Sequence, residues 1–190
     1  MTRPNVTVVN STPSLTPSGK ILADGKEYEV DVVVYATGFS VNDCGPSFPV
    51  TVDGETLTEV WKEGGRKWGG ATLFGIVSGR IPNFFVMYGP HTNTILGSIT
   101  FFSECAAEYV SKIVKGCIDG GIARVTVKEQ AVAKYNSWVG SRFVGRPEMD
   151  SCSAWYKQGG GAVPVTNFPG GMSEYWWMTR KWRKDDYILE

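Results

Sequence analysis

Histidine and cysteine, two residue types that often carry acid–base, nucleophilic or metal chemistry, number one and four in this sequence of 190 residues. Its one histidine, His91, has no carboxylate in sequence that would identify it as a general base, so a loop or capping role is favoured over that function. The four cysteines form no C-x-x-C pair and, with one histidine, do not complete a usual zinc set. Cys105 lies in a predicted helix, where nothing nearby would lower its pKa, and is interpreted as a packing residue. We expect free thiols in a reducing, cytoplasmic compartment, no metal site and no catalytic residue that can be named.

Two glycine turns that follow apolar runs are better candidates for a binding site. The run over 30–40, V-D-V-V-V-Y-A-T-G-F-S, predicts a strand buried on both faces, with a turn at Thr37 and Gly38. The run over 84–88, F-F-V-M-Y, predicts a second buried strand, followed by Gly89 and Pro90. In open α/β sheets, ligands lie beyond the carboxyl ends of such strands. The alternative is a pair of core strands followed by ordinary turns.

The second turn leads into a predicted helix from Ser98 to Lys115. Ser98 suits the N-cap and Gly116 the C-terminal stop. The free N–H groups around Leu96 to Thr100 would favour a negative group by roughly 0.3–1 kcal/mol. This end of the helix could therefore bind an anion or a carbonyl-rich ring, the alternative being a cap that contacts only water. The apolar face of the helix recurs at three- and four-residue steps, at Ile99, Phe102, Ala106, Val110 and Ile113.

The remaining elements would position these turns within one domain, for which no internal boundary is predicted. A strand is expected over 5–9, and the Asp24-Gly25 pair predicts a type I′ hairpin within 20–30. Residues 41–72 are irregular, with one or two helical turns over 57–62. The C-terminal half predicts a strand over 123–127, a helix over 128–143, a hairpin over 154–165 and a short helix over 175–184.

Composition limits the classes of partner. Lys+Arg and Asp+Glu both number 19, so the net charge of zero gives no bulk electrostatic argument for nucleic acid or an anionic membrane. No apolar run approaches a membrane span, and the N-terminus lacks the apolar core of a signal peptide. Five of the seven tryptophans lie from Trp138 onward, so this aromatic-rich part must be buried or form an exposed interface. The oligomeric state stays open.

Four segments occur in an order that resembles one family. They are D-V-V-V-Y-A-T-G-F (31–39), I-P-N-F-F-V-M-Y-G-P (81–90), the S-x-x-x-F-x-S-E-x-A-A-E-Y helix (98–109) and W-Y-K…F-P-G-G-x-x-E-Y (155–175). Together they resemble the C-terminal part of flavin-containing monooxygenases of the Baeyer–Villiger type, such as cyclohexanone and hydroxyacetophenone monooxygenases. The resemblance covers essentially the whole chain.

The resemblance implies an α/β fold, the C-terminal part of a Rossmann-like two-dinucleotide flavoprotein domain, with mixed strands, two main helices and a C-terminal hairpin. It implies FAD and NADP(H) as cofactors, with O₂ and a small organic ketone or nitrogen or sulfur compound as substrates. In the family, two G-x-G-x-x-G motifs, the catalytic arginine and an F-x-G-x-W-type signature lie upstream of this region. This sequence contains neither glycine-rich motif. We therefore expect a fragment of such a monooxygenase that binds FAD weakly or not at all and is inactive alone.

The resemblance also assigns candidate cofactor-binding residues. The A-T-G turn of the family passes close to FAD, and the G-P turn lies near the flavin. The following loop and helix start meet the pyrimidine edge of the isoalloxazine through backbone groups, where a helix N-terminus stabilises the charge of reduced flavin. The two turns are thus expected to converge on one ring. The residues that match are Thr37, Gly38, Gly89, Pro90, Leu96, Gly97, Ser98 and Ile99.

Some residues depart from the family pattern or fit it in two ways. His91 replaces the asparagine that follows G-P in many relatives, and Leu96-Gly97 replaces a frequent His-Asn. Trp155 matches a tryptophan that can contact the nicotinamide nucleotide, although a role in the core of the hairpin is favoured because tryptophan is highly buried on average. Phe39, Phe101 and Trp155 are candidate pocket aromatics.

Two other readings stay open. The chain could be a non-catalytic relative or an aromatic-rich module that binds an apolar ligand, a sugar or a protein. It could also lack an independent fold, because its strands would pair with a βαβ unit that it does not contain.

Overall fold

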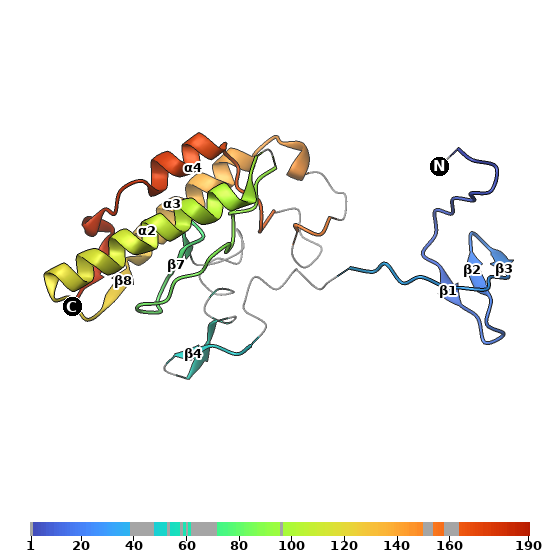
Figure 1. Cartoon of the computed structure of the whole chain (residues 1–190), viewed down its shortest axis with the longest axis horizontal. Coiled ribbons are helices and arrows are strands. Elements are labelled where there is room, and N and C mark those ends of the chain that lie inside the picture. Colours follow the sequence, from blue (N-terminus) through green and yellow to red (C-terminus); the bar gives the residue numbers. More distant parts are fainter. Residues whose placement is uncertain are drawn as a thin grey trace. The chain divides into compact units, whose positions relative to one another are not determined.

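A computed structural model describes residues 2–38, 48–52, 54–57, 59, 61, 72–95, 97–149, 154–157 and 164–190. Their contacts group the chain into two compact units, Met1–Phe39 and Ser40–Glu190. The prediction that the whole chain is one portion of one FAD/NAD(P)-binding domain stays a prediction. The two units are described separately below, and Figure 1 labels their elements.

The first unit is a three-stranded antiparallel sheet of β1 (Ser14–Leu15), β2 (Ile21–Ala23) and β3 (Lys26–Tyr28). The predicted hairpin is confirmed, since Asp24 and Gly25 join β2 to β3 with φ values of 49° and 71°. The Asp24 carboxylate accepts hydrogen bonds from the backbone N–H groups of Asn10 and Ser11, which lower its pKa. Asp24 thereby ties the N-terminal segment to the hairpin.

The two longer strands predicted for this unit are wrong. Residues 5–9 form no strand, and neither do residues 30–38, the described part of the predicted buried strand. The valines of that segment are exposed, Val32 at 76% and Val34 at 83%. A strand buried on both faces needs hydrogen-bonded neighbours and two covering layers, and the described residues supply neither.

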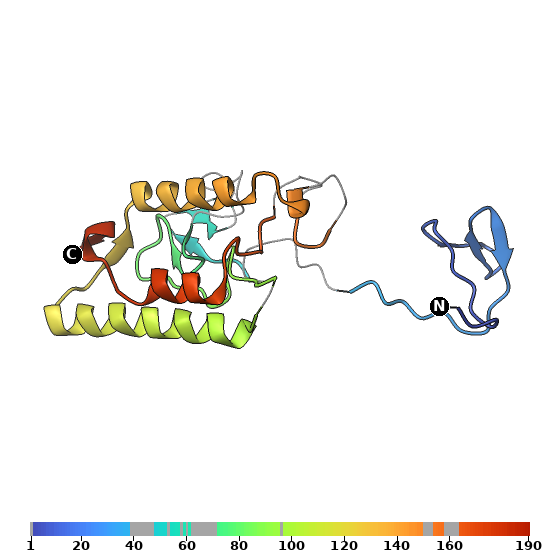
Figure 2. The same ribbon diagram turned by 90° about the horizontal axis from the view of Figure 1, so that it is seen from above.

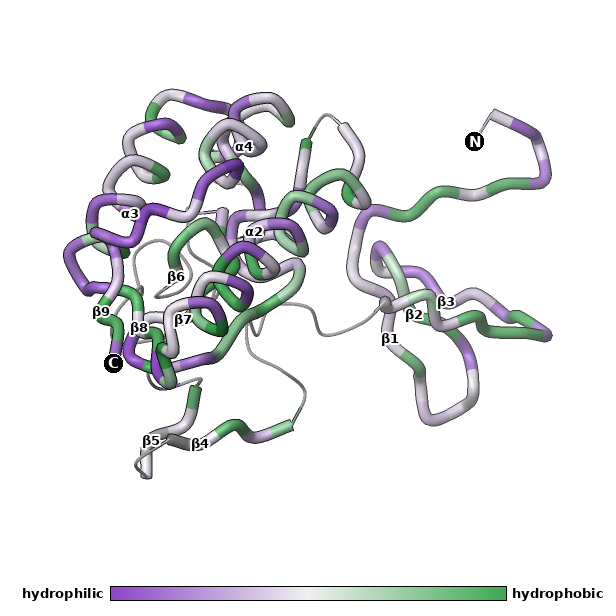
Figure 3. Tube along the Cα trace, turned by 60° about the vertical axis from the view of Figure 1, so that its left-hand side comes forward, coloured by the Kyte–Doolittle hydropathy of each residue, from purple (hydrophilic) through white to green (hydrophobic). Residues whose placement is uncertain are grey.

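The second unit contains the α-helices α2 (Ile99–Gly120), α3 (Glu129–Phe143) and α4 (Met172–Thr179). In Figure 2, α4 runs alongside α2, and the two helices are in contact. Hydrophobic and hydrophilic residues alternate along α2 in Figure 3, as expected for a helix with one buried face. The core between these elements is aromatic: Phe102 stacks on Tyr175 with ring centroids 4.3 Å apart, and Phe168 packs edge-on against both.

Short antiparallel pairs complete the second unit. They are β4 (Thr51–Val52) with β5 (Glu55–Thr56), β6 (Thr72–Leu73) with β7 (Val77–Ser78), and β8 (Val125–Val127) with β9 (Tyr187–Leu189). Two single-turn 3₁₀ helices are also present: η1 (Pro147–Met149) follows α3, and η2 (Lys184–Asp186) precedes β9. The architecture is thus mixed α/β with small antiparallel sheets. Within the described residues, parallel pairing is limited to two isolated bridges, Gly79 with Val127 and Asn93 with Asn167.

The predicted buried strand over 84–88 reduces to a single bridge between Phe85 and Val77. Asn83 and Tyr88 have left-handed backbones, with φ of 55° and 60°, and a strand cannot continue through them. Phe84, Phe85 and Val86 still pack against the core. The apolar run therefore indicated contact with the core for three of its five residues, since Met87 and Tyr88 are exposed at 50% and 44%, and the predicted strand length was wrong.

The predicted helix over 98–115 is confirmed and longer than expected. The chain continues through Gly116 and ends at Gly121, which has φ 63° and donates its N–H to the Cys117 and Ile118 carbonyls. Gly116 serves packing instead: a Cβ there would overlap the Trp182 ring, with one ring carbon 2.9 Å away. The glycine that was interpreted as a stop is the contact surface for an indole.

The other elements predicted for the C-terminal half have the predicted type, helix or strand, but some of their bounds differ. The strand and helix over 123–143 are confirmed as β8 and α3, and the short helix over 175–184 is α4 followed by η2. Of the hairpin over 154–165, the described residues contain one antiparallel bridge, between Lys157 and Pro164. Leu57 and Trp61 are helical and buried, as the periodicity over 57–62 predicted.

Candidate functional site

Two glycines hold the Gly89-Pro90 turn against the loop between β6 and β7. A Cβ on Gly75 would overlap the Pro90 carbonyl, and one on Gly89 would overlap the Gly75 carbonyl. Next to this contact, the Val86 N–H donates to the Ile76 carbonyl at 2.7 Å. The turn is thus fixed by backbone-to-backbone packing that no larger residue permits.

His91 is fully buried directly after this turn. Its backbone is left-handed, with φ 58°, and its N–H donates to the Val165 carbonyl at 3.2 Å. Neither ring nitrogen makes a well-formed hydrogen bond within the described part of the chain. Burial lowers the pKa of His91 from 6.5 to about 4, partly offset by the Pro164 backbone. The imidazole is therefore a neutral packing group in a loop, in line with the loop role that the sequence favoured over a general base.

The loop beyond His91 is tied to the segment that precedes α4. Asn93 donates its backbone N–H to the Thr166 carbonyl and accepts from the Phe168 N–H, at 2.9 and 2.7 Å. Its side-chain amide donates to Asn167 Oδ1 at 2.8 Å. These bonds fix the path of the chain from Gly89 toward the start of α2.

The N-terminus of α2 is capped as predicted. Ser98 Oγ accepts a hydrogen bond from the Phe101 N–H at 3.3 Å. The Ser98 N–H donates to Met172 Sδ at 3.3 Å, and Gly97, with φ 140°, leaves space for that side chain, which would lie 2.7 Å from a Cβ. The N–H groups of Ile99 and Thr100 have no hydrogen-bond partner among the described residues. Two donors at the positive end of the helix dipole are thus available to an acceptor.

The structure places the predicted residues in three groups. Gly89, Pro90, Gly97, Ser98 and Ile99 lie on one loop that leads into α2. Thr37 and Gly38 lie in the first unit, where both are exposed and Gly38 has φ 72°. The convergence of the two turns on one ring therefore stays a prediction. Leu96 and Phe39 lie outside the described residues.

The predicted aromatics have different surroundings. Trp155 is 55% exposed and contacts Tyr156 edge-on, with ring centroids 5.9 Å apart, so its interpretation as hairpin core is wrong. Phe101 is partly buried against the core. Cys105 is a buried core residue, as predicted, and burial raises the pKa of its thiol.

One residue that contacts the start of α2 was not predicted from the sequence. Met172 begins α4, and its thioether accepts the hydrogen bond from the Ser98 N–H across 74 positions of sequence. The only signal was its place after the Pro169-Gly170-Gly171 turn. A long-range sulfur contact has no local sequence pattern, so it could be found only from the structure.

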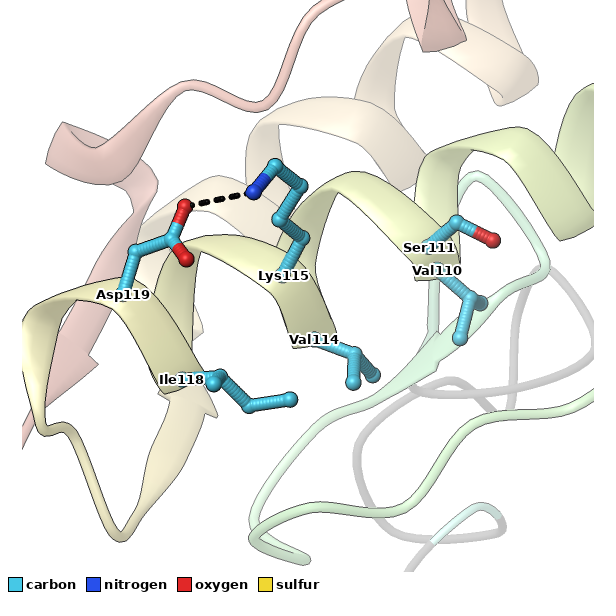
Figure 4. Close-up of a pocket in the computed structure, with 6 residues that line it drawn as sticks. All are labelled: Val110, Ser111, Val114, Lys115, Ile118 and Asp119. Atoms are coloured by element: carbon cyan, nitrogen blue, oxygen red, sulfur yellow. Dashed lines mark hydrogen bonds and ion pairs between the residues drawn. The ribbon is translucent and has the colours of Figure 1, made fainter.

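A hollow on the outer side of α2 is apolar and carries no comparable chemistry. In Figure 4, Val110, Val114 and Ile118 lie along one side of the helix, and the Lys115–Asp119 ion pair of 2.9 Å lies on the other. Among the described residues, no group of three or more His, Cys, Asp or Glu side chains could hold a metal ion. No described helix is long and apolar enough to cross a membrane.

Comparison with known proteins identifies relatives along nearly the whole chain. A Baeyer–Villiger monooxygenase from Streptomyces coelicolor is 31% identical over 185 residues, which cover 95% of this chain and 34% of that protein. The FAD-binding monooxygenase ktnD from Aspergillus niger is 28% identical over 182 residues, 93% of this chain and 29% of that protein. No model of a known protein family matches the chain.

Solved structures show the same fold. Cyclohexanone monooxygenase from Rhodococcus sp. Phi1, bound to NADP⁺, superposes with a TM-score of 0.69 at 20% identity, over 90% of this chain and 32% of that one. OTEMO in complex with FAD and NADP also gives 0.69, at 23% identity, over 93% and 32%. The chain spans about a third of the length of these proteins. It is a partial homologue of the Baeyer–Villiger and FAD-binding monooxygenases.

Proposed function

We propose that this chain is the C-terminal segment of an FAD- and NADPH-dependent monooxygenase that inserts one oxygen of O₂ into a ketone or into a soft nitrogen or sulfur centre. The observation that carries the proposal is the similarity to a Baeyer–Villiger monooxygenase along 95% of the chain. Because the chain matches only about a third of that protein, its own role is to complete a flavin site and not to supply all of it.

The start of α2 fits a flavin in the kind of groups that it offers. The edge of an isoalloxazine ring is rich in carbonyl acceptors, and the Ile99 and Thr100 N–H groups are donors without a partner in the described part. Ile99 is also 47% exposed, which leaves apolar surface beside the donors. Bound FAD would supply the redox and oxygen chemistry. The chain's own contribution would be to bind and orient the ring through Gly97, Ser98 and Ile99, backed by the rigid Gly89-Pro90 turn.

The other candidate residues have less support. Thr37, Gly38 and Leu96 are proposed as FAD contacts from the family resemblance alone. Trp155 is proposed as a contact of NADP(H), and its exposed ring is accessible to a nucleotide. A second candidate function, a non-catalytic aromatic-rich binding module, is favoured by the exposed rings of Trp155, Trp176 and Trp177.

A chimera tests the proposal. The matching third of the Streptomyces coelicolor enzyme is replaced by this chain, and bound FAD and NADPH-dependent conversion of a ketone are measured. We expect FAD to be retained and to be lost with Gly97→Val, because a side chain there collides with Met172 and shifts the start of α2. Gly171→Ala is the matched control, since its φ of −92° suits alanine and a Cβ there meets nothing within 4 Å.

A chimera that folds, as judged by circular dichroism and a cooperative melt, and yet holds no FAD would contradict the proposal and favour the binding module. The chain alone provides a second measurement. It lacks a glycine-rich pyrophosphate cradle, so we expect weak FAD binding or none. A yellow protein that keeps stoichiometric FAD through dialysis would contradict that expectation.

A further inference from the structure

A partly open cavity is bordered by β6, α3, α4 and the segment around η2. Its volume is about 320 Å³, within the range of small-molecule pockets. None of the residues at the start of α2 lines it. The cavity therefore lies apart from the donors proposed to face a flavin.

Its walls are aromatic and come from three elements. Phe74, after β6, packs edge-on against Tyr135 of α3, with centroids 5.3 Å apart and planes at 83°. Tyr135 in turn stacks on Trp138 with centroids 5.9 Å apart and planes at 23°. Trp177 of α4 completes the lining. Such a set offers both faces and edges to a flat ring.

Trp177 is held in place although it is 56% exposed. The guanidinium of Arg180, the residue that follows α4, lies 3.2 Å from the centroid of its ring in a cation–π contact. A side chain that is already fixed loses less entropy when it binds a ligand. The exposed indole is thus arranged for binding before any ligand arrives.

Charged side chains at the cavity favour an anion. Four of them line it: Lys134, Arg183, Glu174 and Asp186. Glu174 is already paired with Arg142, at 3.0 Å. Within the described residues Lys134, Arg183 and Asp186 form no ion pair, which leaves two cations against one acid. A guanidinium beside an ammonium suits a carboxylate, which accepts from both.

From these features we infer that the cavity binds a planar aromatic carboxylate, with its ring among Tyr135, Trp138 and Trp177 and its carboxylate at Lys134 and Arg183. The aromatic side chains of the cavity would select a ligand with a flat ring, and the two cations would select a ligand with a negative charge. Asp186 opposes an anion, so binding would be moderate and dependent on salt.

Calorimetric titration of the 190-residue chain with 2-naphthoate tests this inference. We expect saturable binding that weakens about tenfold or more with Trp177→Ala and with the double variant Lys134→Gln/Arg183→Gln. Trp176→Ala and Lys181→Gln are matched controls. They lie on the same helix or just after it, do not line the cavity, and should keep the affinity within about twofold.

Ligand chemistry and cavity filling provide further comparisons. The uncharged 2-naphthol should bind about tenfold more weakly than 2-naphthoate, because it cannot use the two cations. Ala131→Leu places a larger side chain in the cavity and should abolish binding while the melting temperature is retained. Equal losses with Trp176→Ala and Trp177→Ala, equal binding of the two naphthalenes, or no binding by the folded wild-type chain would each overturn the inference.

Discussion

Two segments of this chain have similar apolar sequences but differ in secondary structure and in burial. Residues 30–38 are as apolar as any core strand, yet they form no strand and their valines are exposed. Residues 84–120 contain a comparable run and then a helix, and both pack into an aromatic core. Composition alone does not separate the two segments.

The difference lies in where each segment finds its partners. Most backbone hydrogen bonds of a helix form within the helix itself. In addition, α2 has a serine N-cap and buries one face within its own unit. A strand leaves every backbone group to a neighbour. Segment 30–38 has no such neighbour among the described residues of its own unit.

The largest effect is expected from acid, acting on the packed segment. Because the pKa of His91 is lowered to about 4, the unfolded chain binds a proton between pH 6.5 and 4 that the folded chain does not. The free energy of unfolding should keep its full value above pH 6.5 and should fall by about 3 kcal/mol as the pH drops from 6.5 to 4. Urea unfolding at several pH values measures this loss.

His91→Asn provides the control, since asparagine tolerates the left-handed backbone of φ 58° and does not titrate. The chain has no other histidine, so the difference between the two pH profiles isolates this group. Parallel profiles for wild type and variant between pH 6.5 and 4 would show that His91 is not buried in solution.

The next largest effect concerns Gly116 in α2. Gly116→Ala should lower the free energy of unfolding by about 1–3 kcal/mol, since the added Cβ displaces the Trp182 ring. Gly120→Ala makes the same change in the same helix and should be neutral or stabilising by up to about 1 kcal/mol. Chemical denaturation measures both. Equal effects at the two glycines would argue against the Trp182 contact.

The serine cap is expected to have an intermediate effect. Ser98→Ala removes the acceptor for the Phe101 N–H and should cost about 1 kcal/mol of stability. Ser111→Ala, on the exposed side of α2, should be neutral or slightly stabilising by at most about 0.5 kcal/mol. Thermal melts of the two variants give the comparison, and a loss at Ser111 as large as at Ser98 would contradict it.

The smallest effect on stability is expected in the exposed segment. The double variant Val32→Lys/Val34→Lys should change the free energy of unfolding by less than about 0.5 kcal/mol. It should also reduce self-association, measured by sedimentation, because it removes an exposed apolar segment. A loss of several kcal/mol would mean that these valines are buried in solution, and the contrast between the two segments would disappear.

Local signals predicted much of the fold. Asp24-Gly25 predicted its hairpin through the backbone angles that the turn requires, and Ser98 with the periodicity after it predicted the start of α2. The predictions were wrong where the role of a residue is set by a partner that lies far away in the sequence or by backbone angles that the sequence does not show. Gly116 was interpreted as a stop because Trp182 lies 66 positions later, and 84–88 as a full strand because left-handed Asn83 and Tyr88 have no sequence signature. The candidate site was predicted on its helix side, while Met172 could not be foreseen.

The contact between Gly116 and Trp182 has a consequence for the opposite end of α2. Each residue of an α-helix turns the chain by about 100°, so fixing one position fixes the direction in which every other position points. The close packing of the Trp182 ring on Gly116 restricts both the rotation of α2 about its axis and its sliding along that axis. The positions of the Ile99 and Thr100 N–H groups are thus determined in part by a contact some five turns away.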